Sequence, residues 1–303
     1  RKRLQRHFRS SAWASAVRMG GKCCTDRKDV GKKPDRKSVT VSNAYDSKKR
    51  AISIGYNAKG DDAEKFDKAF EANDLKAFVS LLSSQQPIES FEERMHPWAE
   101  DPRTVGALAG TQLAILASMA EKDNPRVKDD IREAGGIPPI VDFLKSDQTD
   151  RVQTAVVALS FLTAECPHNA HEVYNAGAMP FLLKHLDSEV AGMRAAAATT
   201  LRNVCMESDD FRQKFVDLGG IRGLVQQLSA APDPALNQAD VQLESILNLE
   251  DVIEREDGSV IEAYARQAVA AGAEGKLRQL AKSDDEEVRG AAEEVLEALA
   301  RVK

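Results

Sequence analysis

Long apolar runs are missing from this sequence, and no stretch approaches the roughly 20 uncharged residues that a membrane-spanning helix needs. The first residues also lack the apolar core of a secretory signal. Only four cysteines are present, two of them adjacent at Cys23 and Cys24 and two isolated at Cys166 and Cys205. Because adjacent cysteines rarely pair with each other, we expect no disulfide framework, a reducing compartment such as the cytosol, and no crossing of the bilayer by the chain itself.

Catalytic and metal-binding patterns are missing as well. The glycines of Gly106–Gly110 have neither the Lys-Ser/Thr pair nor the preceding strand of a phosphate loop. No nucleophile elbow and no isolated pair of carboxylates is visible. Cys166, His168 and His171 lie close together, but a zinc site needs about four ligands and no second cluster supplies them. We therefore expect a structural or solvated role for these residues, with no catalysis, no cofactor, no metal and no small-molecule substrate.

Charge is divided unevenly along the chain. Residues 1–50 carry 16 Lys and Arg against 4 Asp, a net charge of +12, whereas residues 51–303 have a net charge of −18. The basic head contains almost no aromatic residues for base stacking, and the body is acidic. This pattern argues against nucleic acid as a partner and favours attraction of the head to anionic lipid.

Self-similar segments recur in the second half of the chain. Each begins with a small tripeptide that contains glycine, and these tripeptides start at intervals of 42, 42 and 53 residues. They are Ala134-Gly135-Gly136, Ala176-Gly177-Ala178, Leu218-Gly219-Gly220 and Ala271-Gly272-Ala273. A helix that turns sharply into the next one needs a residue that tolerates positive φ at its end, which glycine supplies. Repeats of this length, each covering the apolar stripe of its neighbour, indicate a solenoid.

Each tripeptide precedes a short apolar helix, a polar break and a longer alanine-rich helix. Pro138 stands in the first turn of one short helix, where proline is favoured. The turn-rich segments Ala230–Asp240 and Glu254–Ser259 accommodate the longer third interval. The longer helices are predicted over Val152–Ala164, Met193–Met206 and Val288–Ala300.

The segment Ala134–Ser146 reads AGGIPPIVDFLKS and resembles the start of an armadillo repeat, a three-helix unit of about 42 residues. The resemblance implies an all-α fold, a right-handed superhelical solenoid of the armadillo type over residues 61–303. Residues 63–133 form more divergent units and a capping region in this interpretation, with helices predicted over Asp74–Leu82 and Thr104–Glu121.

Solenoids of this kind bind extended partners along a concave face, which the third helix of each unit lines. In many armadillo proteins these helices carry a repeated Leu-x-Asn ladder that grips the partner backbone. The ladder pattern is clear once, at Leu201–Asn203, and Asn248 fits it only with a shift. Val157 and Thr199 stand where nuclear-import receptors carry tryptophan, which argues against recognition of basic nuclear signals.

Six residues are therefore candidates for a partner groove, spaced by three or four positions along one helix face. The candidates are Val157, Phe161, Thr199, Asn203, Met206 and Glu207. An alternative is that Val157, Phe161 and Met206 are core residues of ordinary amphipathic helices. Asn203 is the strongest candidate, because a polar amide among alanine and leucine needs a hydrogen-bond partner.

Residues 19–60 read as a flexible basic leader with a short ordered stretch at Ala51–Tyr56, and residues 1–18 read as an extension upstream of the true start. If Met19 is the initiator, Gly20 is the position that an N-myristoyl group needs, although Cys24 replaces the usual Ser or Thr. Cys23 and Cys24 are then palmitoylation candidates. The nearby basic residues Lys22, Arg27, Lys28, Lys32, Lys33, Arg36 and Lys37 add attraction to an anionic surface.

The alternative for the first residues is that 1–18 belong to the mature chain. This segment is rich in Arg and Ser without acids and then resembles a mitochondrial presequence. In that case Gly20 is internal and myristoylation cannot occur.

An acylation motif, a short polar leader and then only armadillo repeats together resemble the armadillo-repeats-only family of apicomplexan parasites. The resemblance implies acylation at Gly20, Cys23 and Cys24, and attachment through the acyl chains to the cytosolic face of the rhoptry membrane. It also implies that the chain positions this organelle through partners that include a myosin and an adenylate cyclase. Two rival functions are a soluble armadillo nucleotide-exchange factor of the 70-kDa chaperone and an acylated adaptor of the vacuole type.

Overall fold

The computed structural model describes residues 38–42, 51–91, 99–119, 124–229, 238–255 and 257–302. Most of these residues are helical, and they divide into two compact units between Ala176 and Gly177. We call the described residues up to Ala176 the N-terminal unit and those from Gly177 the C-terminal unit. The predicted extension 1–18 lies outside the described residues, as does most of the predicted leader.

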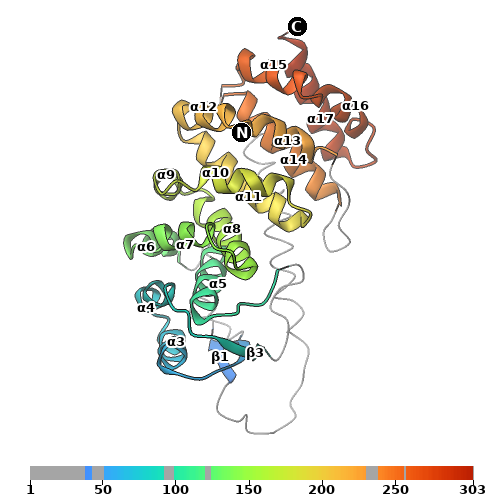
Figure 1. The fold of residues 1–303 in the computed structure, drawn as a ribbon. Helices are drawn as coiled ribbons and strands as arrows, with labels where there is room; N and C mark the ends of the chain where they lie inside the picture. Colours follow the sequence, from blue (N-terminus) through green and yellow to red (C-terminus); the bar gives the residue numbers. More distant parts are fainter. Residues whose placement is uncertain are drawn as a thin grey trace. The chain divides into compact units, whose positions relative to one another are not determined.

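The N-terminal unit builds short helices around two longer ones, α5 and α8, which pack against each other (Figure 1). Helices α7 and α9 also contact α8, and α4 contacts α5. Its elements are β1 (Ser38–Ser42), β2 (Ala51–Ala58), α3 (Asp61–Ala72), α4 (Leu75–Leu81), β3 (Ile88–Phe91), α5 (Val105–Ser118), α6 (Val127–Glu133), α7 (Ile137–Phe143), α8 (Thr149–Thr163) and α9 (Pro167–Asn175).

A small antiparallel sheet of order β1-β2-β3 differs from the sequence prediction, which placed only helices and a flexible leader in this region. Val39 pairs with Ile54, and Tyr56 pairs with Phe91. The signal was present in the alternation of Val or Ile with Ser or Thr, SVTVS in β1 and ISI in β2. Because the residues around these segments are mostly polar, the sequence prediction favoured a flexible leader over strands. The ordered stretch expected at Ala51–Tyr56 is present as part of β2, and β1 is a strand within the predicted leader that the sequence prediction did not include.

Aromatic rings hold the sheet against the first helices. The ring of Phe66 lies 5.8 Å from Tyr56, nearly perpendicular to it, and 5.4 Å from Phe78, measured between centroids. The Tyr56 hydroxyl donates a hydrogen bond to Asp67 Oδ1 at 2.6 Å. Because Phe66 and Phe78 are fully buried, this cluster closes the apolar interior at the start of the N-terminal unit.

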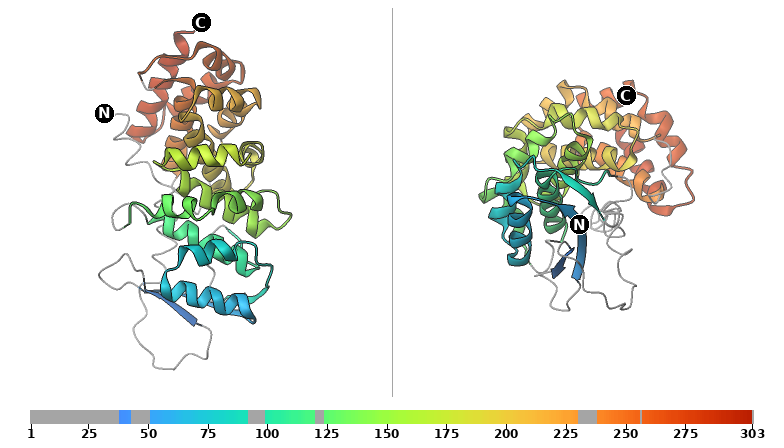
Figure 2. Two further views of the ribbon diagram at one scale, coloured as in Figure 1. Left: turned by 90° about the vertical axis from the view of Figure 1, so that its left-hand side faces the viewer. Right: turned by 60° about the horizontal axis from the view of Figure 1, so that its bottom comes forward.

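The C-terminal unit repeats the arrangement of short helices around long ones, in successive layers (Figure 2). Helix α11 contacts α14, and α14 in turn contacts α17. Its elements are α10 (Met179–Lys184), a 3₁₀ turn (His185–Asp187), α11 (Ala191–Met206), α12 (Asp209–Asp217), α13 (Gly220–Gln227), α14 (Gln238–Ile253), α15 (Glu262–Ala270), α16 (Ala273–Leu280) and α17 (Glu286–Ala300).

The predicted glycine turns are confirmed. Gly219 has a φ of +83° and Gly272 a φ of +89°, a conformation that residues with a Cβ rarely adopt. Gly220 is needed for a different reason, since a Cβ there would lie 2.2 Å from the ring of Phe215. The first glycine thus reverses the chain, and the second lets α13 approach α12 closely.

The predicted long helices are also confirmed, as α8, α11 and α17, each beginning two or three residues earlier than expected. Asp74 and Thr104 cap α4 and α5 through their side chains, as the predicted starts require. The expected turn after α14 is closed by a bridge between Glu254 and Val260. None of the described helices combines the length and the apolar character that crossing a membrane requires.

Candidate partner-binding faces

The six groove candidates lie on two helices that belong to different units. Val157 and Phe161 are on α8 in the N-terminal unit. In the C-terminal unit, Thr199, Asn203 and Met206 are on α11, and Glu207 is the C-cap of that helix. Val157 is half-buried, whereas Phe161 is only 9% exposed. For Phe161, burial favours the alternative that it is a core residue.

The first half of α8 holds a neighbouring loop through buried polar groups. The Asp150 carboxylate accepts a hydrogen bond from the backbone N–H of Arg103 at 2.8 Å. Arg151 donates to the backbone oxygen of Ser84 at 2.7 Å and to Thr104 Oγ1 at 3.2 Å. Burial lowers the pKa of Arg151, and the adjacent Asp150 opposes that shift. These contacts fix the entry to α5, so this part of α8 has a structural role.

On α11, by contrast, the candidates share one partly open face. Thr199, Asn203 and Glu207 follow one another at four-residue steps, and Met206 lies beside them. All four side chains are half-buried. These four residues therefore stay candidates for the partner groove.

Helix α14 packs directly on α11. Arg202 Nε donates to Asp251 Oδ2 and forms an ion pair in which the side chains are 18% and 3% exposed. Asn248 lies one turn before Asp251 and is 1% exposed. Asn203 and Asn248 thus lie on two helices that are in contact, and the interpretation of Asn248 as a second ladder position stays a prediction.

Sequence reasoning missed Arg202 and Asp251. The signal available was an arginine and an aspartate among apolar residues at the ends of two helices, because charged residues are rarely buried unless they are paired. The pairing could not be assigned from the repeat spacing, because the third interval is 11 residues longer than the others and blurs the register of α14.

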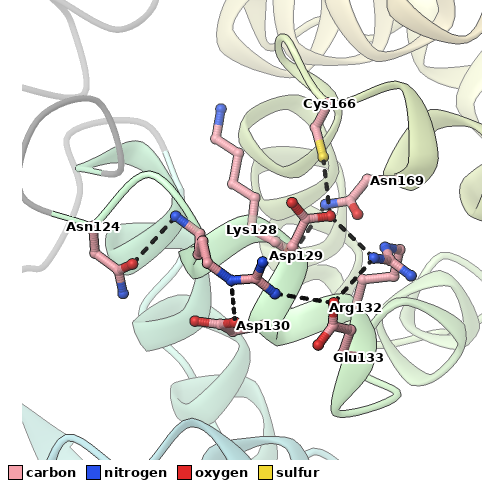
Figure 3. Close-up of polar contacts among 9 residues, drawn as sticks. Asn124, Lys128, Asp129, Asp130, Arg132, Glu133, Cys166 and Asn169 are labelled. Carbon is pink, nitrogen blue, oxygen red and sulfur yellow. Dashed lines mark hydrogen bonds and ion pairs between the residues drawn. The ribbon is translucent and has the colours of Figure 1, made fainter.

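The Cys-Pro-His-Asn-Ala-His segment contributes a structural asparagine. Asn169 is fully buried, and its Nδ2 donates to the backbone oxygens of Lys128 at 3.1 Å and Leu162 at 2.9 Å. One of these oxygens belongs to α6 and the other to α8, so a single amide joins three helices of the N-terminal unit (Figure 3).

Charged side chains of α6 form a cluster next to Asn169 (Figure 3). Arg132 pairs with Asp129 at 3.0 Å, and Asp129 Oδ1 lies 4.0 Å from Cys166 Sγ. His168 is exposed on α9. No group of three or more His, Cys, Asp or Glu that could hold a metal occurs in the described part of the chain.

Both described cysteines are buried free thiols. Burial raises the pKa of Cys166 and of Cys205, the latter strongly because it is fully enclosed in α11. Neither thiol has the lowered pKa of a nucleophile, so they act as small apolar residues of the core.

The predicted lipidation residues Gly20, Cys23 and Cys24 lie outside the described residues, as do the seven basic residues that follow them. The lipidation of these residues therefore stays a prediction.

Comparison with known proteins agrees with this architecture. The armadillo/beta-catenin-like repeat matches residues 124–164 and 166–206. The solved structure of ARO, the armadillo repeats only protein from Plasmodium falciparum, is 39% identical in sequence to this chain. The similarity covers 80% of this chain and 99% of that one, with a TM-score of 0.73. The chain belongs to the armadillo-repeat family. Its fold is the predicted armadillo solenoid.

More distant armadillo proteins share the fold or part of the sequence. The designed armadillo repeat protein YIII(Dq)4CqI is 23% identical with a TM-score of 0.58, over 78% of this chain and 86% of that one. Importin subunit alpha-1b of Oryza sativa subsp. japonica is 29% identical over 156 residues, which are 51% of this chain and 28% of the importin. Armadillo repeat-containing protein 3 of Homo sapiens is 32% identical over 98 residues, 32% of this chain and 11% of that protein. The chain thus spans less than a third of these curated relatives.

Proposed function

We propose that this chain is a membrane-anchored scaffold that recruits protein partners to the cytosolic face of an organelle membrane. The observation that carries the proposal is the similarity to ARO at 39% identity over 99% of that chain. By the same resemblance the organelle is the rhoptry, and the partners include a myosin and an adenylate cyclase. In this proposal the protein links an organelle membrane to its protein partners and catalyses no reaction.

The anchor proposal rests on the sequence of the leader. A single myristoyl chain at Gly20 gives an association constant of only about 10⁴ M⁻¹, which is too weak for stable attachment. Palmitoyl chains on Cys23 and Cys24 would supply the second signal that stable anchoring needs. Basic side chains between Lys22 and Lys37 would add roughly 1 kcal/mol each near an anionic surface.

For the partner face, the half-buried residues of α11 are the proposed contact region. Asn203 is half-buried on α11, and we take Asn248, on the helix packed against it, as its ladder counterpart. The similarity to importins does not extend to nuclear-signal recognition in this proposal, because Val157 and Thr199 stand at the positions that would need tryptophan.

A labelling experiment tests the anchor. The chain is expressed from Met19 with myristate and palmitate analogues and then fractionated. We expect Gly20→Ala to remove the myristate label, and the double variant Cys23→Ser, Cys24→Ser to remove the palmitate label and release the protein from membranes. Cys205→Ala serves as the matched control, because that thiol is buried and its loss should leave labelling unchanged.

A soluble, unlabelled protein from the Met19 start refutes the anchor and would favour the chaperone nucleotide-exchange factor instead. Protein chemistry on the natural protein is a second test: a mature chain that retains residues 1–18 also refutes the anchor, because Gly20 would then be internal.

A capture experiment tests the partner face separately. We expect Asn203→Ala to weaken capture of the myosin and the adenylate cyclase while membrane binding stays intact. Equal capture by the variant and the parent would remove Asn203 from the contact region. Asn175→Ala, at the exposed end of α9, is the control for a generic loss of an asparagine.

A further inference from the structure

The small sheet of the N-terminal unit has two edge strands, β1 and β3, with β2 between them. An edge strand presents backbone N–H and C=O groups along its outer side, and these groups can pair with a strand from another chain. Proteins usually protect such edges with charged residues, proline or a bulge, or cover them with a loop. The two edges of this sheet differ in these protections.

The β3 edge is protected in several ways. Its second residue, Glu89, is charged and exposed, and a register shift interrupts the pairing of β3 with β2. Just before the strand, Pro87 forms a bridge with Thr104. The backbone N–H of Ile88 donates to the backbone oxygen of Arg103 at 2.9 Å. The segment before α5 therefore already pairs with the start of β3.

The β1 edge has none of the protections that its own sequence could supply. The strand reads SVTVS and contains no charged residue, no proline and no glycine. All five residues pair with β2 without a register shift, from Ser38 opposite Gly55 to Ser42 opposite Ala51. Within the described part of the chain, β2 is the only strand that pairs with β1. The edge strand β1 is thus regular and uncharged, and its valines and threonine favour extended backbone.

The sequence of β1 is also a palindrome, because SVTVS reads the same in both directions. If two copies of β1 run antiparallel about a two-fold axis at Thr40, each Thr40 lies opposite the other Thr40. In the same register Val39 lies opposite Val41, and Ser38 lies opposite Ser42. Every position then meets a residue of its own type, with hydroxyl residues opposite hydroxyl residues and no like charges opposed.

From these features we propose that β1 pairs antiparallel with β1 of a second copy of this chain. The sheets of the two chains then join into one, with the strand order β3-β2-β1-β1-β2-β3. Five residue pairs form about four to six backbone hydrogen bonds, which supply the attraction. The interface is isologous, since the same five residues contribute from each chain.

The palindrome selects a second copy over a strand from a different protein. Pairing with a different protein requires complementarity in one direction only and gives no reason for a symmetric sequence. The pairing does not require acylation, so it is independent of the proposed function. If the proposed anchor is also correct, the pair brings two acylated leaders to one membrane, and binding through two linked anchors is tighter than through one.

Disulfide trapping in the full chain tests the register. The two adjacent cysteines of the leader are replaced by serine, and the remaining native cysteines, Cys166 and Cys205, are buried. Under mild oxidation we expect Thr40→Cys chains to cross-link, because opposite Cα atoms lie about 4.5–5.5 Å apart. Ser38→Cys chains should cross-link about tenfold more slowly among themselves, because the register separates the two Ser38 positions by roughly 14 Å along the strand.

A mixture of Ser38→Cys chains and Ser42→Cys chains should cross-link as readily as Thr40→Cys chains, because Ser38 lies opposite Ser42. This mixture then reports on charge at Thr40. Thr40→Lys in both chains should slow its cross-linking about fivefold, since two ammonium groups lie directly opposite each other. Thr40→Lys in one chain and Thr40→Glu in the other should restore it. The matched control Ser90→Lys, at an exposed position of β3, should leave the rate within about twofold.

Three results overturn the inference. Cross-linking of Ser38→Cys chains alone that is as fast as in the mixture would mean that the contact has no antiparallel register. A Thr40→Lys and Thr40→Glu mixture as slow as the doubly Thr40→Lys one would mean that Thr40 does not lie opposite itself. Absence of cross-links in Thr40→Cys chains with unchanged circular dichroism would show that β1 pairs with no second copy, and the proposed scaffold function would stand without it.

Discussion

The buried ion pair between α11 and α14 gives the sharpest stability prediction. Arg202→Met keeps most of the side-chain stem and removes the charge that faces Asp251. Breaking a buried pair by removing one partner costs about 3–5 kcal/mol. Because Arg202 is 18% exposed and its site can admit some water, we expect about 3 kcal/mol for this substitution.

The double variant Arg202→Met, Asp251→Leu separates the pair from simple packing. Replacing a whole buried pair by apolar residues is often neutral, so we expect the double variant to regain most of the stability that the single one loses. The assay is urea unfolding followed by circular dichroism, with the free energy extrapolated to water. A loss below about 1 kcal/mol for Arg202→Met, or a double variant as unstable as the single, would refute a buried and coupled pair.

Three further perturbations follow from the described contacts. Gly220→Ala should destabilise the fold by about 2 kcal/mol or more, because the new Cβ would meet the Phe215 ring. Gly290→Ala in α17 should stabilise the fold by about 0.5 kcal/mol, because the space around that Cβ is open. Urea unfolding of the two variants checks both values. Asn169→Ala should cost about 2–4 kcal/mol, since it leaves two backbone oxygens without their donor, and a loss under about 1 kcal/mol in urea unfolding would contradict that role. The folded state raises the pKa of Cys205, so the free energy of unfolding should fall as pH rises above about 8.5, where the unfolded thiol ionises and the folded one does not. Stability measured at pH 7 and pH 10 should fall less in Cys205→Ala, and an identical fall in both proteins would count against the assignment.

Much of the fold could be predicted because the spacing of the repeats shows where each unit begins. The recurring glycine tripeptides, at intervals of 42, 42 and 53 residues, predicted the turns. Alanine-rich periodicity located the starts of α8, α11 and α17 to within three residues. Side-chain caps at Asp74 and Thr104 marked the more divergent helices. Local chemistry decides these features, so a single sequence is enough to find them.

Other features depend on tertiary contact and could not be predicted in this way. Phe161 is buried because other helices pack on α8. The sequence pattern could not predict this, because an apolar residue at helical spacing can lie either in a groove or in the core. Arg202 and Asp251 meet only after the stacking of α11 and α14 has set their relative register. The sheet β1-β2-β3 was missed for a different reason, since its short alternating strands lie in a polar, charged context.

The most direct test of the scaffold is co-fractionation of the chain, started at Met19, with its proposed partners. If the account is right, the myosin or the adenylate cyclase appears in the membrane fraction with the parent chain. Gly20→Ala should move chain and partner together into the soluble fraction, whereas Asn203→Ala should leave the chain on the membrane and release the partner. Membrane association of chain and partner that neither substitution changes would contradict the account.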